Sequence, residues 1–219
     1  FKRATPEEKI KSKRYLLSLV TAENALPANS DILSLATSPE MIKAVGSYLG
    51  CLPVLTYANV WYSPVLEEVA EAEGSQRWHL DHEDLRQMKV FIYCSDVDDN
   101  AGPMWLVDAD TSLGIAHDIG YSTTQKSKRV NDQSFDDAQQ VSLTGCVGDI
   151  AFVDTSSCFH LGSRNTKKPR LLISLQYLGP QAYVARTHSN PELSQAIKEN
   201  NPHLGKWLAS FSGEMKAST

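Results

Sequence analysis

A histidine and an aspartate stand two residues apart in the central segment Gln76-Arg77-Trp78-His79-Leu80-Asp81-His82. In an extended strand, residues at this spacing point to the same face. His79 and Asp81 can therefore present an imidazole and a carboxylate to one metal ion. A lone His-x-Asp pattern has low specificity, and by itself a surface or hydrogen-bonded histidine is the more common explanation.

A third donor stands far downstream and changes this balance. His160 follows a strand-like run, and Arg170 opens the next one, Leu171–Tyr177. Two imidazoles and one carboxylate suit iron(II) and leave open positions for a co-substrate and oxygen. An arginine on the next strand can bind a distal carboxylate through two parallel hydrogen bonds, a geometry that lysine cannot match. We therefore expect His79, Asp81 and His160 to hold the metal.

The stretch from about Pro53 to Leu178 resembles the phytanoyl-CoA dioxygenase family of iron(II)/2-oxoglutarate oxygenases. Several spaced motifs carry the resemblance in the family's order: Trp78-His79-Leu80-Asp81, Lys89 to Val97, Asn100-Ala101-Gly102-Pro103-Met104, His160 and Arg170. The resemblance implies a double-stranded β-helix with iron near one mouth. It also implies that 2-oxoglutarate chelates the iron and pairs its far carboxylate with Arg170. One departure is the run Asp108–Ser112, where the family usually has a Pro-Gly-Ser-His turn.

Two further residues enter the predicted site through the resemblance. Asn59 stands where family members often place a polar residue that contacts 2-oxoglutarate, and Gln76 is expected to do the same or to face the substrate. Plain strand-surface roles remain nearly as common for both. Lys89 could neutralise a carboxylate, but a solvated strand residue is the simpler interpretation.

The resemblance implies a reaction with iron(II), 2-oxoglutarate and O2. The expected chemistry is hydroxylation of an unactivated C–H bond in a small-molecule metabolite, with release of succinate and CO2. Related halogenases replace the carboxylate ligand by a small residue, whereas Asp81 is present here, so hydroxylation, desaturation or ring closure is favoured. The alternatives are a non-catalytic cupin-like protein that binds a metal or ligand, and a hydrolase or isomerase with zinc in the triad.

The elements that must position these residues fall into helical and strand-rich parts. A helical lead is expected over about 1–52, with helix starts at Thr5-Pro6 and Ser38-Pro39 and a stop at Gly50. Runs rich in β-branched and aromatic residues then predict strands: Val54–Trp61, Lys89–Val97, Met104–Val107, Asp149–Val153 and Leu171–Leu178. We expect one α+β domain with a jelly-roll core over about 53–178, a polar insertion over about 112–140, and a C-terminal helical segment over about 179–219.

Composition narrows the choice of partners. The chain has 219 residues, 42% of them hydrophobic, and a net charge of −5, which gives no reason to expect a nucleic-acid partner. The short basic run Lys126–Arg129 is best interpreted as a solvated loop. No apolar run approaches the roughly 18 to 20 residues that span a bilayer. Four cysteines without a CxxC pair favour a reduced, cytoplasmic setting. The sequence does not indicate the oligomeric state.

Overall fold

The computed structural model describes residues 14–20, 26–27, 29–65, 71–122, 129–162, 164 and 166–182. The expected helix start at Thr5 and most of the expected C-terminal helical segment lie outside these ranges. None of the helices within them is both long and apolar enough to cross a membrane.

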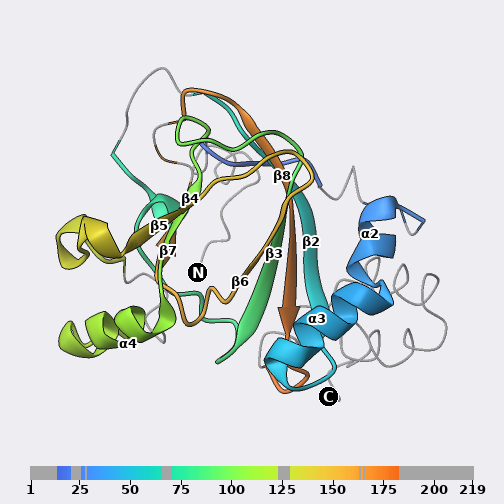
Figure 1. The fold of residues 1–219 in the computed structure, drawn as a ribbon, viewed down its shortest axis with the longest axis horizontal. Helices are drawn as coiled ribbons and strands as arrows, with labels where there is room; N and C mark the ends of the chain where they lie inside the picture. Colours follow the sequence, from blue (N-terminus) through green and yellow to red (C-terminus); the bar gives the residue numbers. More distant parts are fainter. Residues whose placement is uncertain are drawn as a thin grey trace, which may run out of the picture.

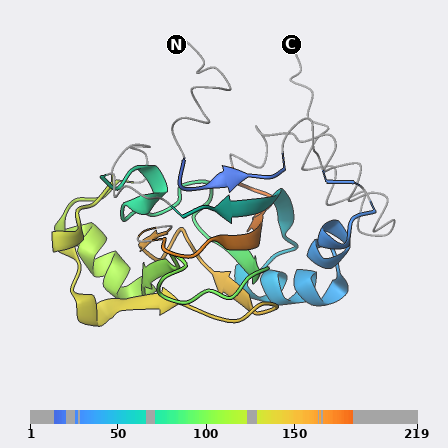
Figure 2. The same cartoon turned by 90° about the horizontal axis from the view of Figure 1, so that it is seen from above.

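Two antiparallel sheets form the core of the molecule (Figure 1). The larger has the order β1-β2-β8-β3-β6, with bounds Leu17–Ser18, Val54–Ser63, Arg170–Leu178, Gln87–Tyr93 and Ile150–Val153. The smaller has the order β5-β4-β7, with bounds Gln140–Leu143, Met104–Val107 and His160–Leu161. The short strand β1 lies along the free edge of β2 (Figure 2). The fold is a double-stranded β-helix with flanking helices, which confirms the predicted fold class.

Two helices cover the outer face of the larger sheet (Figure 1). These are α2 (Asp31–Ala36) and α3 (Pro39–Leu49). The predicted signals operate in α3, because the Ser38 side chain accepts a hydrogen bond from the Met41 amide and Gly50 ends the helix at φ 72°.

Alternate side chains of β3 face the hydrophobic core and the cavity between the sheets. Its even-numbered residues, Met88, Val90 and Ile92, belong to the hydrophobic cluster beneath α2 and α3. Its odd-numbered residues therefore face the other way, toward the space between the sheets. Lys89 is one of them.

The segment 112–140, predicted as a polar insertion, contains regular structure. Helix α4 (Ala109–Asp118) starts just before this segment and continues into it, and Asp108 caps the helix by accepting a hydrogen bond from the Thr111 amide at 2.9 Å. The run that departs from the family pattern is thus a helix start. Two 3-10 turns and β5 follow. Another difference is β1, a strand within the predicted helical lead.

Candidate metal centre

The backbones of His79 and His160 pair directly with each other. The amide of each donates to the carbonyl of the other at 3.1 Å, and their rings lie 4.2 Å apart. Strand β7, which carries His160, also pairs with β4. Residues opposite each other in an antiparallel pair have side chains on one face. The pairing therefore brings together two imidazoles that are 81 positions apart in the sequence.

Asp81 completes the group. Its amide donates to the Thr155 carbonyl at 2.8 Å. Its Oδ1 lies 3.8 Å from Nε2 of His79, and its Oδ2 lies 3.7 Å from Nε2 of His160. The ligand atoms of these residues lie within 4.8 Å of one another, and all three side chains are buried. The structure thus brings the three predicted ligands together in a group that can bind a metal ion.

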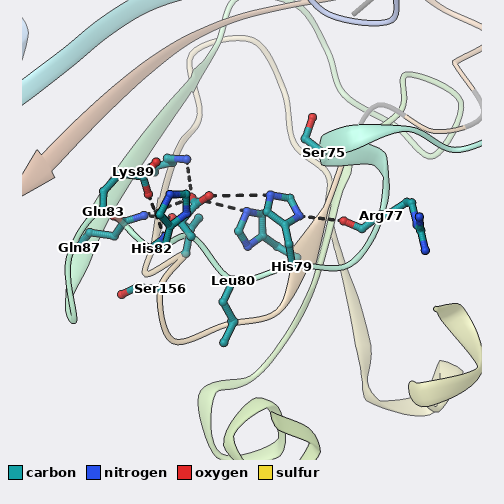
Figure 3. A network of polar contacts seen from close by, with 12 residues as sticks. Ser75, Arg77, His79, Leu80, His82, Glu83, Gln87, Lys89 and Ser156 are labelled. Carbon is teal, nitrogen blue, oxygen red and sulfur yellow. Dashed lines mark hydrogen bonds and ion pairs between the residues drawn. The ribbon is translucent and has the colours of Figure 1, made fainter. Parts of the chain in front are cut away.

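Each imidazole is oriented by a backbone carbonyl two residues before it. Nδ1 of His79 lies 2.8 Å from the carbonyl oxygen of Arg77, and Nδ1 of His160 lies 3.0 Å from that of Cys158. A carbonyl only accepts, so both Nδ1 atoms carry the proton. Figure 3 shows the ring of His79 between the Arg77 carbonyl on one side and its contact with the Asp81 carboxylate on the other. Both Nε2 lone pairs are left to face the metal position.

The protonation states are those that a metal requires. Burial, with the nearby imidazole of His160, lowers the pKa of His79 to about 2, and burial lowers the pKa of His160. Burial opposes ionisation of Asp81, but the Lys89 ammonium and the two imidazoles hold the pKa of its carboxyl below the usual range. Burial also raises the pKa of the neighbouring Cys158 thiol to about 11.

Two residues of β3 bind the Oδ2 atom of Asp81 (Figure 3). Lys89 Nζ lies 2.5 Å from Oδ2, and Gln87 Nε2 donates to the same atom at 3.2 Å. Gln87 also donates to Thr155 Oγ1 at 2.7 Å. Lys89 therefore neutralises a carboxylate. The sequence had favoured the other interpretation, a solvated residue on a strand. The Lys89 side chain is only 19% exposed.

A cavity of about 750 Å³ opens beside this group. Arg170 lines it together with all three predicted ligands. The Arg170 side chain is buried, and one guanidinium nitrogen donates to Ser63 Oγ at 3.3 Å. Burial lowers the pKa of Arg170 to about 10, so the group stays charged at neutral pH. Apolar walls come mainly from both sheets: Tyr57, Trp61, Phe91, Met104, Leu143 and Leu172.

Asn59 and Gln76 are not among the residues that line the cavity. Asn59 lies opposite Ser174, a lining residue, but its carboxamide binds β1 and the segment that follows it: Nδ2 donates to Ser18 Oγ at 2.7 Å, and Oδ1 accepts from the Val20 amide at 3.4 Å. Gln76 Oε1 accepts from the Glu73 amide at 3.1 Å. Contact of either residue with 2-oxoglutarate stays a prediction.

Arg129 is a cavity residue that the sequence interpretation missed. It ends the basic run that was interpreted as a solvated loop, of which 126–128 lie outside the described part of the chain. No local pattern in the sequence marks it, because its position depends on the pairing of Val130 with Trp78. His82 also lines the cavity.

No protein-family model and no curated protein matches the sequence. Solved structures do. SnoN, described as a non-heme alpha ketoglutarate dependent epimerase from nogalamycin biosynthesis, is similar at 19% identity and TM-score 0.50, over 75% of this chain and 62% of SnoN. This chain has the SnoN fold. Weaker similarity extends to the non-heme monooxygenase ThoJ (16% identity, TM-score 0.49, 80% and 74% covered) and EctD from S. alaskensis (14%, 0.48, 77% and 57%).

The chain spans about three fifths of the length of SnoN. The similarity to SnoN supports the fold. Membership of the phytanoyl-CoA dioxygenase family remains a resemblance, since no family model matches.

Proposed function

We propose that this protein is an iron(II)- and 2-oxoglutarate-dependent oxygenase that hydroxylates an unactivated C–H bond of a small-molecule metabolite. One observation carries the proposal. A buried two-histidine, one-aspartate group and a buried arginine line the same cavity. The first is the donor set of non-haem iron(II) oxygenases, and the second is suited to the far carboxylate of 2-oxoglutarate.

The donors fit iron(II) on chemical grounds. His79 and His160 present unprotonated Nε2 atoms, and Asp81 supplies a negative charge. Mixed nitrogen and oxygen ligands with positions left open are the pattern of such iron sites, whereas structural zinc sites are usually closed by four protein ligands. Iron and 2-oxoglutarate, when bound, would supply the activation of dioxygen and yield succinate and CO2.

The residues of the chain itself would bind the co-substrate and keep water away from the reacting bond. Arg170 holds a carboxylate in a buried position, where a charged hydrogen bond is stronger than in water. Tyr57, Trp61 and Phe91 provide an apolar wall that keeps water from the reacting bond. A cavity of about 750 Å³ is within the usual range for a small organic ligand.

A second candidate reaction is epimerisation, because SnoN is described as an alpha ketoglutarate dependent epimerase. Both reactions start from the same protein donors, and they differ in whether oxygen enters the product. A non-catalytic cupin-like protein that binds a metal or ligand is the alternative outside enzymes.

The test is succinate formation under air with iron(II), 2-oxoglutarate and a panel of metabolites, followed by product mass. We expect succinate that depends on all components and a product heavier by one oxygen. An unchanged product mass with inverted stereochemistry would favour epimerisation. Asp81→Ala should abolish succinate, while His117→Ala, an exposed histidine on α4, should not. Absence of both 2-oxoglutarate binding and succinate would contradict the oxygenase proposal.

A further inference from the structure

Arg129 lies next to the metal group on a short backbone pairing. The Val130 amide donates to the Trp78 carbonyl at 2.9 Å, and the two residues form an antiparallel bridge. Trp78 and Val130 are both buried in the cluster of hydrophobic residues below α4. Because side chains alternate along extended chain, the next residues, His79 and Arg129, face the opposite way. Both line the cavity.

This pairing places Arg129 and His160 on either side of His79. The His160 backbone pairs with one edge of the His79 segment, and the Arg129–Val130 segment pairs with the other edge. Arg129, His79 and His160 all line the same cavity.

The acidic groups at the cavity already have partners. Asp81 is bound by Lys89 and Gln87, and Glu83 Oε2 accepts from the His82 amide. Within the described ranges, no ion pair or hydrogen bond joins the Arg129 side chain to another residue. A cation inside a partly apolar cavity is stabilised by an anion there.

With iron(II) and 2-oxoglutarate bound, the cavity would carry one positive charge in excess. Iron(II) and doubly charged 2-oxoglutarate cancel, and the cavity is lined by the three cations Lys89, Arg129 and Arg170 but only the two anions Asp81 and Glu83. Arg129 then has no counter-charge. A cavity with excess positive charge selects ligands of the opposite sign.

We propose that Arg129 binds a carboxylate or phosphate of the substrate, so that the substrate is a small anion with an apolar body. The inference rests on the proposed function. The planar guanidinium suits two-point binding of either oxyanion. The apolar body lies against Tyr57, Trp61 and Phe91, which line the same cavity. The bond to be oxidised then lies close to the metal, since Arg129 and His79 are neighbours across the pairing.

The experiment compares acids with neutral amides of the same shape. The full chain is loaded with zinc(II) and N-oxalylglycine, an unreactive analogue of 2-oxoglutarate, and titrated calorimetrically with benzoate and benzamide, phenylacetate and phenylacetamide, and phenyl phosphate. We expect the acids to bind at least about tenfold more tightly than the amides, as a charged hydrogen bond predicts. Arg129→Gln should remove this preference, and Arg129→Lys should keep part of it.

Arg86→Gln is the matched control, because Arg86 is an exposed arginine whose side chain lies over the ring of Tyr48 and does not line the cavity. It should leave the preference intact. Equal binding of acids and amides by the unaltered protein would overturn the proposal, as would a preference that survives Arg129→Gln. If Arg129→Gln weakens N-oxalylglycine instead of the acids, Arg129 serves the co-substrate and the substrate assignment is wrong.

Failure of the proposed function gives a different result. N-oxalylglycine would then not bind to the zinc-loaded protein at all. The acid and amide titrations, repeated with zinc(II) alone, would still decide whether Arg129 recognises an anion.

Discussion

The ammonium of Lys89 lies 2.5 Å from Oδ2 of Asp81, so a residue of the larger sheet neutralises a predicted metal ligand. Removal of one partner from a buried ion pair leaves the other uncompensated. We expect Lys89→Met to lower the free energy of unfolding of the metal-free protein by about 3 kcal/mol. A bound divalent cation would replace the missing charge. Metal should therefore raise the melting temperature more in Lys89→Met than in the unaltered protein, measured calorimetrically.

The control is Lys43→Met, an exposed lysine on α3. It should change neither stability nor the response to metal. An equal metal response in Lys89→Met and the unaltered protein would show that Lys89 does not compensate the charge of Asp81.

The triad itself is tested by metal binding. His79→Ala, Asp81→Ala and His160→Ala each remove one of three buried donors and should sharply reduce iron(II) affinity in anaerobic titrations. Turnover should be abolished in all three. His117→Ala changes an exposed histidine and should bind iron normally. Unchanged affinity in all three triad variants would mean that the metal, if any, binds elsewhere.

Arg170 is expected to act on the co-substrate and not on the metal. Arg170→Leu should raise the KM for 2-oxoglutarate at least about tenfold, because a charged hydrogen bond contributes roughly 1.5 to 3 kcal/mol. Iron affinity should stay the same. Lys168→Gln, which removes an exposed cation paired with Asp98, serves as the control. A KM that Arg170→Leu leaves unchanged argues against this assignment.

The lowered pKa values of the two buried histidines predict how the free energy of unfolding depends on pH. Their pKa values are lowered in the folded state, that of His79 to about 2, so below about pH 6.5 the unfolded chain binds more protons at these residues. Stability of the metal-free protein should therefore fall as pH drops below about 6.5, by up to about 1.4 kcal/mol per pH unit for each imidazole. Urea unfolding at pH 7.0, 6.0 and 5.0 measures this. His79→Gln should show a shallower slope, and an identical slope would contradict the shift.

Asp81 also bears on the choice between oxygen and halide transfer. As a metal ligand, its carboxylate would occupy the position that halide needs and would balance charge on iron(II). We expect the product formed under labelled dioxygen with excess chloride to carry labelled oxygen and no chlorine, by mass spectrometry. Asp81→Gly should be nearly inactive, since Lys89 and Gln87 are arranged around a carboxylate. A chlorinated main product from the unaltered protein would refute the role of Asp81 as a ligand.

Most of the strands of the core and the pair of His79 and Asp81 were predictable because they depend on short-range periodicity. The spacing of His79 and Asp81 and the alternation in β3 both follow from the two-residue repeat of a strand. The partners of Asn59 were not predictable, because β1 has only two residues and shows no periodicity of its own.

Two further features of the site, the Lys89 ion pair and the position of Arg129, were not predicted because they depend on long-range contacts. The Lys89 ion pair arises only when β3 folds against the segment of Asp81, and no local pattern marks it. Arg129 was assigned by the charge of the run that precedes it, whereas its position depends on the pairing of Val130 with Trp78.

Cys158, whose carbonyl orients His160, places a thiol two residues from a predicted ligand. Oxidants attack the thiolate form of cysteine, and burial raises the pKa of this thiol to about 11. At neutral pH nearly every copy is therefore protonated and a poor target for sulfenic acid formation. In a centre proposed to handle dioxygen, the same burial that keeps the imidazoles neutral also protects the nearby sulfur from oxidative damage.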